Sequence, residues 1–164
     1  MMHELDVATL PLAGQHLVEA SAGTGKTHNI ALLYLRLLLE SGLRVEEIAV
    51  VTFTDAATRE LRSRLRRRVA EAIERLEGAG QQPQDELDLV LNKHRGDKPS
   101  MERALGLLSE ALVGFDEAQV STLHGLCARQ LADLAFETGQ PFVELEANSS
   151  GDATLELVRD FWRR

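Results

Sequence analysis

Short apolar segments alternate along this chain with longer segments in which apolar residues recur at helical spacing. The segment 16–20 and the β-branched run 48–54 have the composition of strands buried on both faces of a parallel sheet. A further strand is predicted at 118–123. Apolar residues three and four positions apart predict helices at 27–41, 56–77 and 124–136. The alternation favours an α/β fold with a parallel sheet.

The same periodicity predicts which side chains the helices bury. The expected buried positions are Ile30, Leu33, Leu37 and Leu38 in the first helix, Leu61, Leu65, Val69 and Ile73 in the second, and Leu126, Leu131, Leu134 and Ala135 in the third. Ser41 and Gly42 are expected to end the first helix, and Asp55 is expected to cap the second.

A break in the pattern at 78–83, rich in glycine and glutamine, is followed by two further helical stretches. They cover about 86–91 and 100–112, and a polar connector at 92–99 separates them. We therefore expect a helical insertion at about 78–117 within the α/β domain.

Composition fits one soluble globular domain, with 164 residues of which 44% are hydrophobic. The last ten residues have the pattern of a helix that stops without a capping signal, so we expect the chain to be part of a longer protein. The single cysteine, Cys127, excludes an internal disulfide and is expected to be a small buried residue. With no secretory signal and no apolar run of membrane-spanning length, the sequence predicts a cytoplasmic location and no membrane partner.

The net charge of −8 argues against a uniformly basic nucleic-acid surface. Nevertheless, six arginines concentrate on the helix predicted at 56–77, so a local basic stripe is expected there. They are Arg59, Arg62, Arg64, Arg66, Arg67 and Arg68.

The stretch 20–27, Ala-Ser-Ala-Gly-Thr-Gly-Lys-Thr, lies between the first predicted strand and the first helix. It follows the phosphate-loop pattern G-x-x-x-x-G-K-[ST], except that Ala20 replaces the first glycine. Backbone N–H groups of such a loop and of the helix start surround phosphates. Lys26 supplies a cation and Thr27 a hydroxyl for Mg²⁺.

Two other segments follow predicted strands, at 52–55 and 121–125, on the sheet edge expected to carry the phosphate loop. Ligands of open α/β sheets bind beyond the carboxyl ends of the strands. Hydroxyls, an aromatic ring and a histidine at these ends suit a sugar-phosphate backbone and an unstacked base. Taken alone, however, the pattern favours threonines that cap helices and a Phe53 in the core.

Three motifs in this order resemble motif I, motif Ia and the following DNA-contact motif of UvrD/RecB-type superfamily 1 DNA helicases. They are Ala20-Ser21-Ala22-Gly23-Thr24-Gly25-Lys26-Thr27, Val51-Thr52-Phe53-Thr54-Asp55-Ala56-Ala57-Thr58-Arg59-Glu60-Leu61-Arg62 and Ser121-Thr122-Leu123-His124-Gly125-Leu126-Cys127. The resemblance implies a RecA-like P-loop NTPase motor domain, here incomplete. It implies that 1–140 belong to the first motor domain (1A) and 141–164 begin a helical subdomain (1B).

The resemblance also implies roles for individual residues. ATP and Mg²⁺ would be bound by Ala22, Gly23, Thr24, Gly25, Lys26 and Thr27, with Thr27 as the metal ligand, Lys26 and Thr27 as the catalytic residues and Gln15 as a candidate contact of the adenine. Single-stranded DNA would contact Thr52, Phe53, Thr54, Thr122 and His124, with Arg59, Arg62 and Arg64 as further candidates. The implied partners are DNA, as a single strand or a duplex end, and other subunits of an exodeoxyribonuclease V-like complex.

The implied function is that of an ATP-binding N-terminal part of an ATP-dependent DNA helicase/exonuclease in double-strand-break repair and recombination. ATP hydrolysis needs a carboxylate near Mg²⁺, which the family supplies from a later strand. Asp116 and Glu117 are not expected to replace it, since the apolar residues before them complete a helix that Gly114 interrupts. This part alone is therefore expected to be inactive.

Two alternatives stay open at this point. The chain could be a self-contained P-loop phosphotransferase in which Asp116 and Glu117 are catalytic. It could also be a non-catalytic module that binds nucleotide or DNA and keeps the fold without the motor.

Overall fold

A computed structural model describes residues 5–19, 25–78 and 85–134 of the chain. The elements are α1 (Lys26–Glu40), the 3₁₀ turn η1 (Val45–Glu47), β1 (Val50–Thr52), α2 (Asp55–Leu76), α3 (Glu86–Asn92), α4 (Lys98–Val113), the 3₁₀ turn η2 (Phe115–Glu117), β2 (Val120–Thr122) and α5 (Leu123–Asp133). The chain divides into two compact units, Met1–Leu126 and Cys127–Arg164. Residues 20–24 of the phosphate loop lie outside the described residues.

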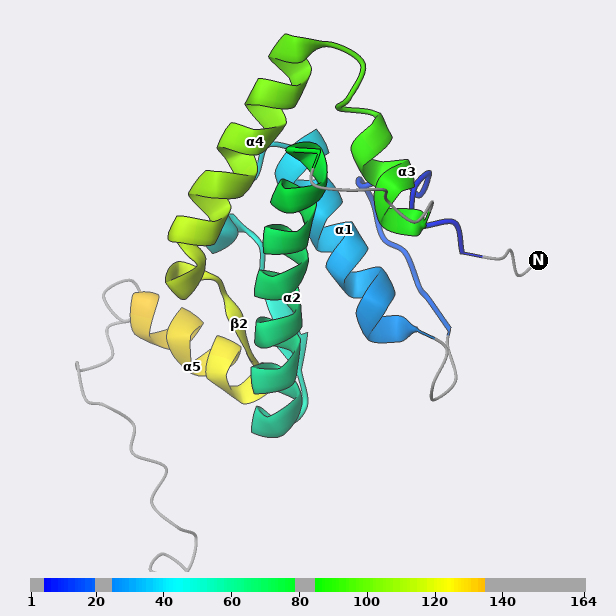
Figure 1. The fold of residues 1–164 in the computed structure, drawn as a ribbon. Coiled ribbons are helices and arrows are strands. Elements are labelled where there is room, and N and C mark those ends of the chain that lie inside the picture. The colour runs from blue at the N-terminus through cyan, green and yellow to red at the C-terminus, as the bar shows by residue number, and fades with distance from the viewer. Residues whose placement is uncertain (1–4, 20–24, 79–84, 135–164) are drawn as a thin grey trace, which may run out of the picture. The chain divides into compact units, whose positions relative to one another are not determined.

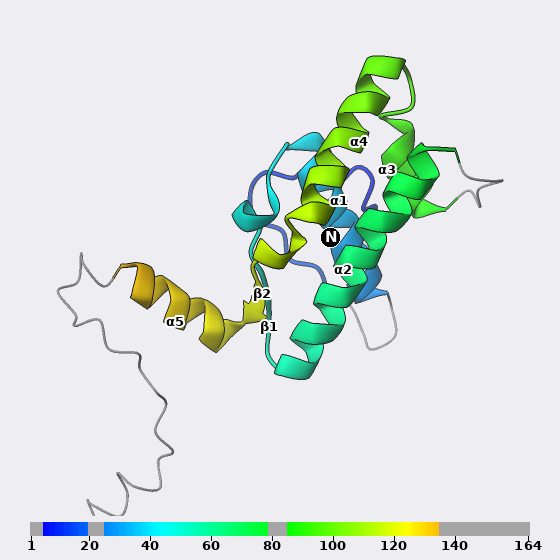
Figure 2. The same ribbon diagram turned by 60° about the vertical axis from the view of Figure 1, so that its left-hand side comes forward.

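The two described strands form a parallel pair, as the sequence predicted, in which Val50 is opposite Val120 and Thr52 is opposite Thr122. Both are shorter than predicted. The connection from β1 to β2 runs through α2, α3 and α4. In Figures 1 and 2, α1 and α2 run in the same direction, so their first turns point to the same end of this unit. This is the end at which β1 and β2 finish.

The strand predicted at 16–20 is not formed by its described part, residues 16–19. Leu17 is 88% exposed and Val18 is also exposed. A strand is stabilised by hydrogen bonds to a neighbour, and no strand within the described residues pairs with this segment. The prediction of a buried strand is therefore wrong for residues 16–19, although the segment is apolar.

Helix α1 forms where predicted, and its predicted burial is confirmed in part. Leu38 is buried and Leu33 and Leu37 are partly buried, whereas Ile30 is exposed. The helix also buries Leu32, Leu35 and Leu39. The helix packs against α2, α3 and α4, so its buried surface is broader than the single stripe that the sequence suggested. The helix ends at Glu40, and Gly42 takes a φ of 64°, which lets the amide of Leu43 donate to the carbonyl of Leu37 at 3.3 Å.

Helix α2 confirms most of its predicted stripe, since Leu61, Leu65 and Val69 are buried and Ile73 is partly buried. The helices predicted beyond residue 83 also form, as α3 and α4. Their apolar residues join the same core, with Leu87, Val90, Leu91 and Leu108 fully buried. The core thus lies between α1, α2, α3 and α4.

Helix α5 does not bury the apolar residues predicted for it. None of its residues is fully buried: Leu126 is partly buried and Leu131 is exposed. Leu134, directly after the helix, is exposed as well. Cys127, expected to be buried, is exposed as well. An apolar stripe predicts burial only where another element packs on it, so these three expectations are wrong for the described residues. Ala135 lies outside them.

Candidate functional site

The first turn of α1 carries the described end of the phosphate loop. Gly25 precedes the helix with φ 79° and ψ 15°, a left-handed conformation that favours glycine, and this N-cap residue has no side chain to offer as a cap. No acidic residue lies in the first turn. Lys26 is exposed and Thr27 partly so. The backbone N–H groups of a helix start, a cation and a hydroxyl fit a phosphate with Mg²⁺.

A network of threonines fixes the junction between β1 and α2. Thr54 is the N-cap of α2, with its hydroxyl accepting from the amide of Ala57 at 3.2 Å. The hydroxyls of Thr52 and Thr58 are 2.6 Å apart, and Thr58 Oγ1 also donates to the carbonyl of Thr54 at 3.0 Å. Asp55, predicted as the cap, is instead the first helical residue. That prediction is wrong, because the threonine before it has the extended backbone that a cap requires.

The end of β2 has a similar turn. Thr122 Oγ1 accepts from the amide of Gly125 at 3.2 Å. A Cβ at Gly125 would lie 3.4 Å from that same oxygen, so the glycine permits a close approach. Since Thr122 is opposite Thr52 in the register, the predicted juxtaposition of the two strand ends is confirmed.

Phe53 lies directly after β1 and is 90% exposed. The expectation that it belongs to the core is therefore wrong. Beyond β2, Leu123 and His124 are also exposed. An exposed ring that follows Thr52 and precedes Thr54 leaves a surface on which a base can stack.

The arginine stripe of α2 divides into two kinds of residue. Arg62 donates to the carbonyls of Phe115 and Asp116, at 3.3 and 2.6 Å, and so holds α2 against η2. Arg64 pairs with Glu60 on its own helix. Arg59, one turn from Thr54, is exposed. Of the three candidate arginines, the geometry leaves Arg59 as the one available to a phosphate at the strand ends.

Asp116 and Glu117 lie in η2, before β2 begins. Thr122 marks the opposite, carboxyl end of that strand, where ligands of parallel sheets bind. The Asp116 side chain is 87% exposed and pairs with Arg66 at 3.4 Å. This position supports the rejection of the pair as metal ligands for the phosphate loop. Within the described residues, no three His, Cys, Asp or Glu side chains form a group that could hold a metal.

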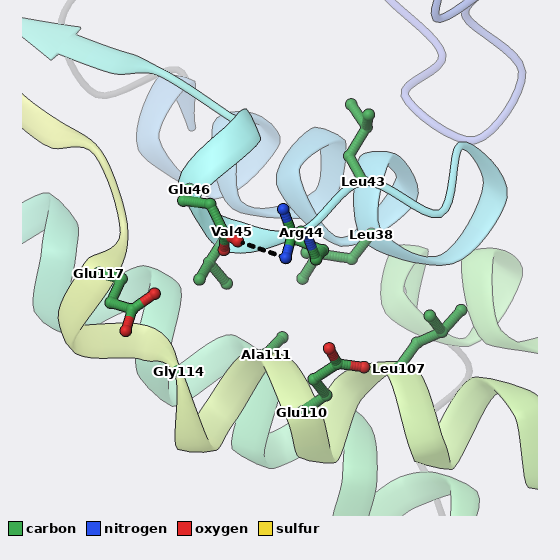
Figure 3. Close-up of a pocket in the computed structure, with 10 residues that line it drawn as sticks. All are labelled: Leu38, Leu43, Arg44, Val45, Glu46, Leu107, Glu110, Ala111, Gly114 and Glu117. Atoms are coloured by element: carbon green, nitrogen blue, oxygen red, sulfur yellow. Dashed lines mark ion pairs between the residues drawn. The ribbon is translucent and has the colours of Figure 1, made fainter.

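A groove of about 180 Å³ lies on the same side as η2, between the loop that precedes β1 and the end of α4 (Figure 3). Its base is apolar, with Val45 and Ala111, and Glu110 and Glu117 extend along its rim. Arg44 is paired with Glu46 at 2.9 Å. Residues 44–46 precede β1, and Gly114 and Glu117 precede β2. The groove therefore lies near the amino ends of the two strands, whereas the candidate site lies at their carboxyl ends.

Sequence reasoning missed His28, which follows Thr27 directly. Its ring lies within hydrogen-bonding distance of Arg68 on α2 and Glu86 on α3. These partners are 40 and 58 residues away in the sequence. Only the packing of three helices reveals the contact, and no local motif could have indicated it.

A helix start that follows a left-handed glycine and opens with Lys-Thr, together with two parallel strand ends rich in hydroxyls, characterises this mixed α/β domain. The model of the UvrD/REP helicase N-terminal domain matches residues 1–161, and the chain belongs to this family. No described helix has the length and apolar character needed to cross a membrane.

Curated relatives carry the name RecBCD enzyme subunit RecB. The chain is 44% identical to the Escherichia coli K12 protein, with 98% of this chain covered, and 41% identical to the Haemophilus influenzae protein, with 97% covered. For Mycobacterium tuberculosis H37Rv the identity is 37% over 92% of the chain. The chain spans 14% of the length of each of these relatives.

Proposed function

We propose that this chain is the ATP-binding N-terminal part of the first RecA-like motor domain of a RecB-like DNA helicase/exonuclease subunit, acting in double-strand-break repair and recombination. The family match supports this proposal. The observation that carries it is the register that places Thr52 opposite Thr122, because this brings the ends of the two DNA-contact motifs together.

In this proposal ATP binds with Mg²⁺ at residues 22–27, and hydrolysis of the bond between its β- and γ-phosphates drives the intact motor. Lys26 neutralises phosphate charge, and Thr27 presents its hydroxyl to the metal. The backbone amides in the first turn of α1 donate hydrogen bonds to the phosphate oxygens. Gln15, which is exposed, is proposed as a contact of the adenine.

Single-stranded DNA lies along the strand ends in this proposal. Phe53 stacks on a base, and Thr54, His124 and the amides of the adjacent turns contact the sugar-phosphate backbone. Thr52 and Thr122 also lie along the DNA in this proposal, and the hydrogen bonds of their hydroxyls within the chain hold the two turns in place. Arg59 adds a phosphate contact.

The remaining parts of the proposal concern the cellular location, the partners and the domain organisation of the protein. The whole protein acts in the cytoplasm on single-stranded DNA or duplex ends, together with other subunits of an exodeoxyribonuclease V-like complex. Residues 1–140 contribute to domain 1A, with the insertion at about 78–117, and 141–164 begin subdomain 1B. Relatives named as subunits of the RecBCD enzyme support this assignment.

Replacing Phe53 with alanine is expected to weaken binding of a labelled oligothymidylate about tenfold, because stacking of one base on an aromatic ring is lost. Fluorescence anisotropy at constant salt measures the affinity. The matched control is Val113→Ala, which removes another exposed apolar side chain at the end of α4. Equal affinity of the Phe53 variant and the control would contradict the DNA path along β1.

ATP hydrolysis distinguishes the proposal from the phosphotransferase alternative. We expect the 164-residue chain to bind Mg-ATP and to turn it over little. Steady turnover that is lost in Asp116→Asn and indifferent to DNA would select the phosphotransferase instead. Steady DNA-stimulated turnover that is lost in Lys26→Ala would show that the chain by itself contains the complete hydrolytic machinery.

A further inference from the structure

His28 connects three helices next to the phosphate loop. Its Nδ1 is 3.0 Å from the guanidinium of Arg68 on α2, and its Nε2 is 2.9 Å from the carboxylate of Glu86 on α3. Arg68 is itself held by Glu71 at 3.0 Å. The imidazole therefore bridges a cation and an anion that come from different helices.

The chemistry of these partners fixes the direction of each hydrogen bond. A guanidinium has only donors, so Arg68 donates and His28 Nδ1 accepts. Nε2 then carries the ring proton and donates it to Glu86. With both ring nitrogens engaged, the orientation of the imidazole is determined, and the backbone of His28 is held at a defined place against α2 and α3.

His28 directly follows the two residues that are proposed to bind phosphate and Mg²⁺. Lys26 and Thr27, which would hold phosphate and Mg²⁺, are the two residues before it on the same helical turn. The N-cap residue, Gly25, has no side chain with which to cap this helix. The hydrogen bonds of His28 to Arg68 and Glu86 attach the turn to α2 and α3.

The exposure of the network argues against a mainly global role. The side chains of His28 and Glu86 are 39% and 58% exposed. Because Nδ1 accepts from Arg68, the contact with Glu86 is a hydrogen bond from Nε2, and a solvent-exposed hydrogen bond adds little to the stability of a fold. The geometry of the two contacts instead restricts one helix start. This distinguishes the network from the buried apolar contacts that hold α1, α2 and α4 together.

We infer that His28 is a positioning residue of the nucleotide site, which holds the Lys26–Thr27 turn in register with α2 and α3 through Arg68 and Glu86. The inference rests on the proposed function, since it assumes that this turn binds the phosphates of ATP. His28 does not touch the nucleotide in this assignment.

The test measures the dissociation constant of a non-hydrolysable Mg-ATP analogue for variants of the 164-residue chain, together with the melting temperature of each. His28→Phe keeps a ring and removes both hydrogen bonds, and we expect its affinity to fall about tenfold. His28→Asn preserves an acceptor near Nδ1 and His28→Gln a donor near Nε2, so each should lose about threefold.

Arg68→Met should lower the affinity about fivefold. The double variant Arg68→Met, His28→Phe should lose no more affinity than His28→Phe alone, because both substitutions remove the same hydrogen bond, the one between Arg68 and His28 Nδ1. Arg67→Met is the matched control. It removes an exposed charge from the position of α2 directly before Arg68 and should leave the affinity unchanged.

Three outcomes are decisive. The positioning role is supported if the His28 variants bind the analogue more weakly while their melting temperatures equal that of the Arg67→Met control. Unchanged affinity in His28→Phe, or affinity that falls only in step with the melting temperature, overturns it and leaves the proposed function intact. Absence of nucleotide binding by the wild-type chain overturns the proposed function, and the inference with it.

Discussion

Replacing Lys26 with alanine is expected to lower the affinity of the chain for Mg-ATP about 100-fold, the largest effect of a single substitution at the nucleotide site. A charge-assisted hydrogen bond to a phosphate contributes about 1.5–3 kcal/mol, and the full loss of the cation corresponds to the upper part of this range. Isothermal titration calorimetry with a non-hydrolysable analogue measures the change directly.

Lys98 provides a closely matched control for this prediction. Like Lys26, it is the first residue of a helix, but the N-cap of α4 is Asp97, whose carboxylate accepts from the amide of Ser100 at 2.7 Å. An anionic cap excludes a phosphate from that helix start. Lys98→Ala should therefore leave nucleotide affinity unchanged. Equal losses in the two variants would indicate that general positive charge, not the phosphate loop, attracts the nucleotide.

The contrast between the two helix starts explains how much of the site could be predicted from sequence. Asp97 and Thr54 are ordinary capping residues followed by regular helical patterns, and both cap their helices. Gly25 before Lys26 breaks this rule. A local departure from good capping is typical of a functional helix start, and it is readable without a structure.

Other features depended on contacts between distant segments, which no local pattern encodes. The strand predicted at 16–20 needs a neighbouring strand to pair with, and the apolar stripe of α5 needs another element packed on it. Among the described residues, apolar side chains of both segments are exposed, including Leu17, Val18 and Leu131. Hydrophobic periodicity reports what a segment could bury, whereas burial itself depends on what the fold places beside it.

Ion pairs between helices depend on the same kind of contact. Charges on a helix are usually solvated, yet Arg75 pairs with Asp85 at 2.7 Å and with the buried Asp88 at 3.4 Å. Arg95 completes the set by donating to Asp88 at 3.0 Å and to the carbonyl of Arg75. These contacts attach the short helix α3 to the end of α2. Spacing along a helix predicts only pairs within it, so the links between helices could not be derived from the sequence.

A second such network joins the N-terminal segment to α1. Arg36, only 4% exposed, donates to the carbonyls of Val7 and Leu10 at 2.8 and 2.6 Å. It also forms a bidentate pair with Glu40, at 2.7 and 2.9 Å, and Lys93 reaches the same carboxylate at 3.1 Å. The hydrogen bond to Arg36, followed by that to Lys93, lowers the pKa of Glu40 from 4.5 to about 2.

Glu40→Gln is therefore expected to lower the free energy of unfolding by about 2–3 kcal/mol at neutral pH, and by little near pH 2. Because the pKa of Glu40 is depressed in the folded chain, its ionised carboxylate stabilises the fold fully above pH 4.5. This stabilisation is lost as the pH falls from about 4.5 through about 2. Urea unfolding at several pH values should give a flatter profile for Glu40→Gln than for the wild type. Glu110→Gln, at an exposed position of α4, should retain the wild-type profile, and parallel profiles for all three proteins would refute the assignment of this acid sensitivity to Glu40.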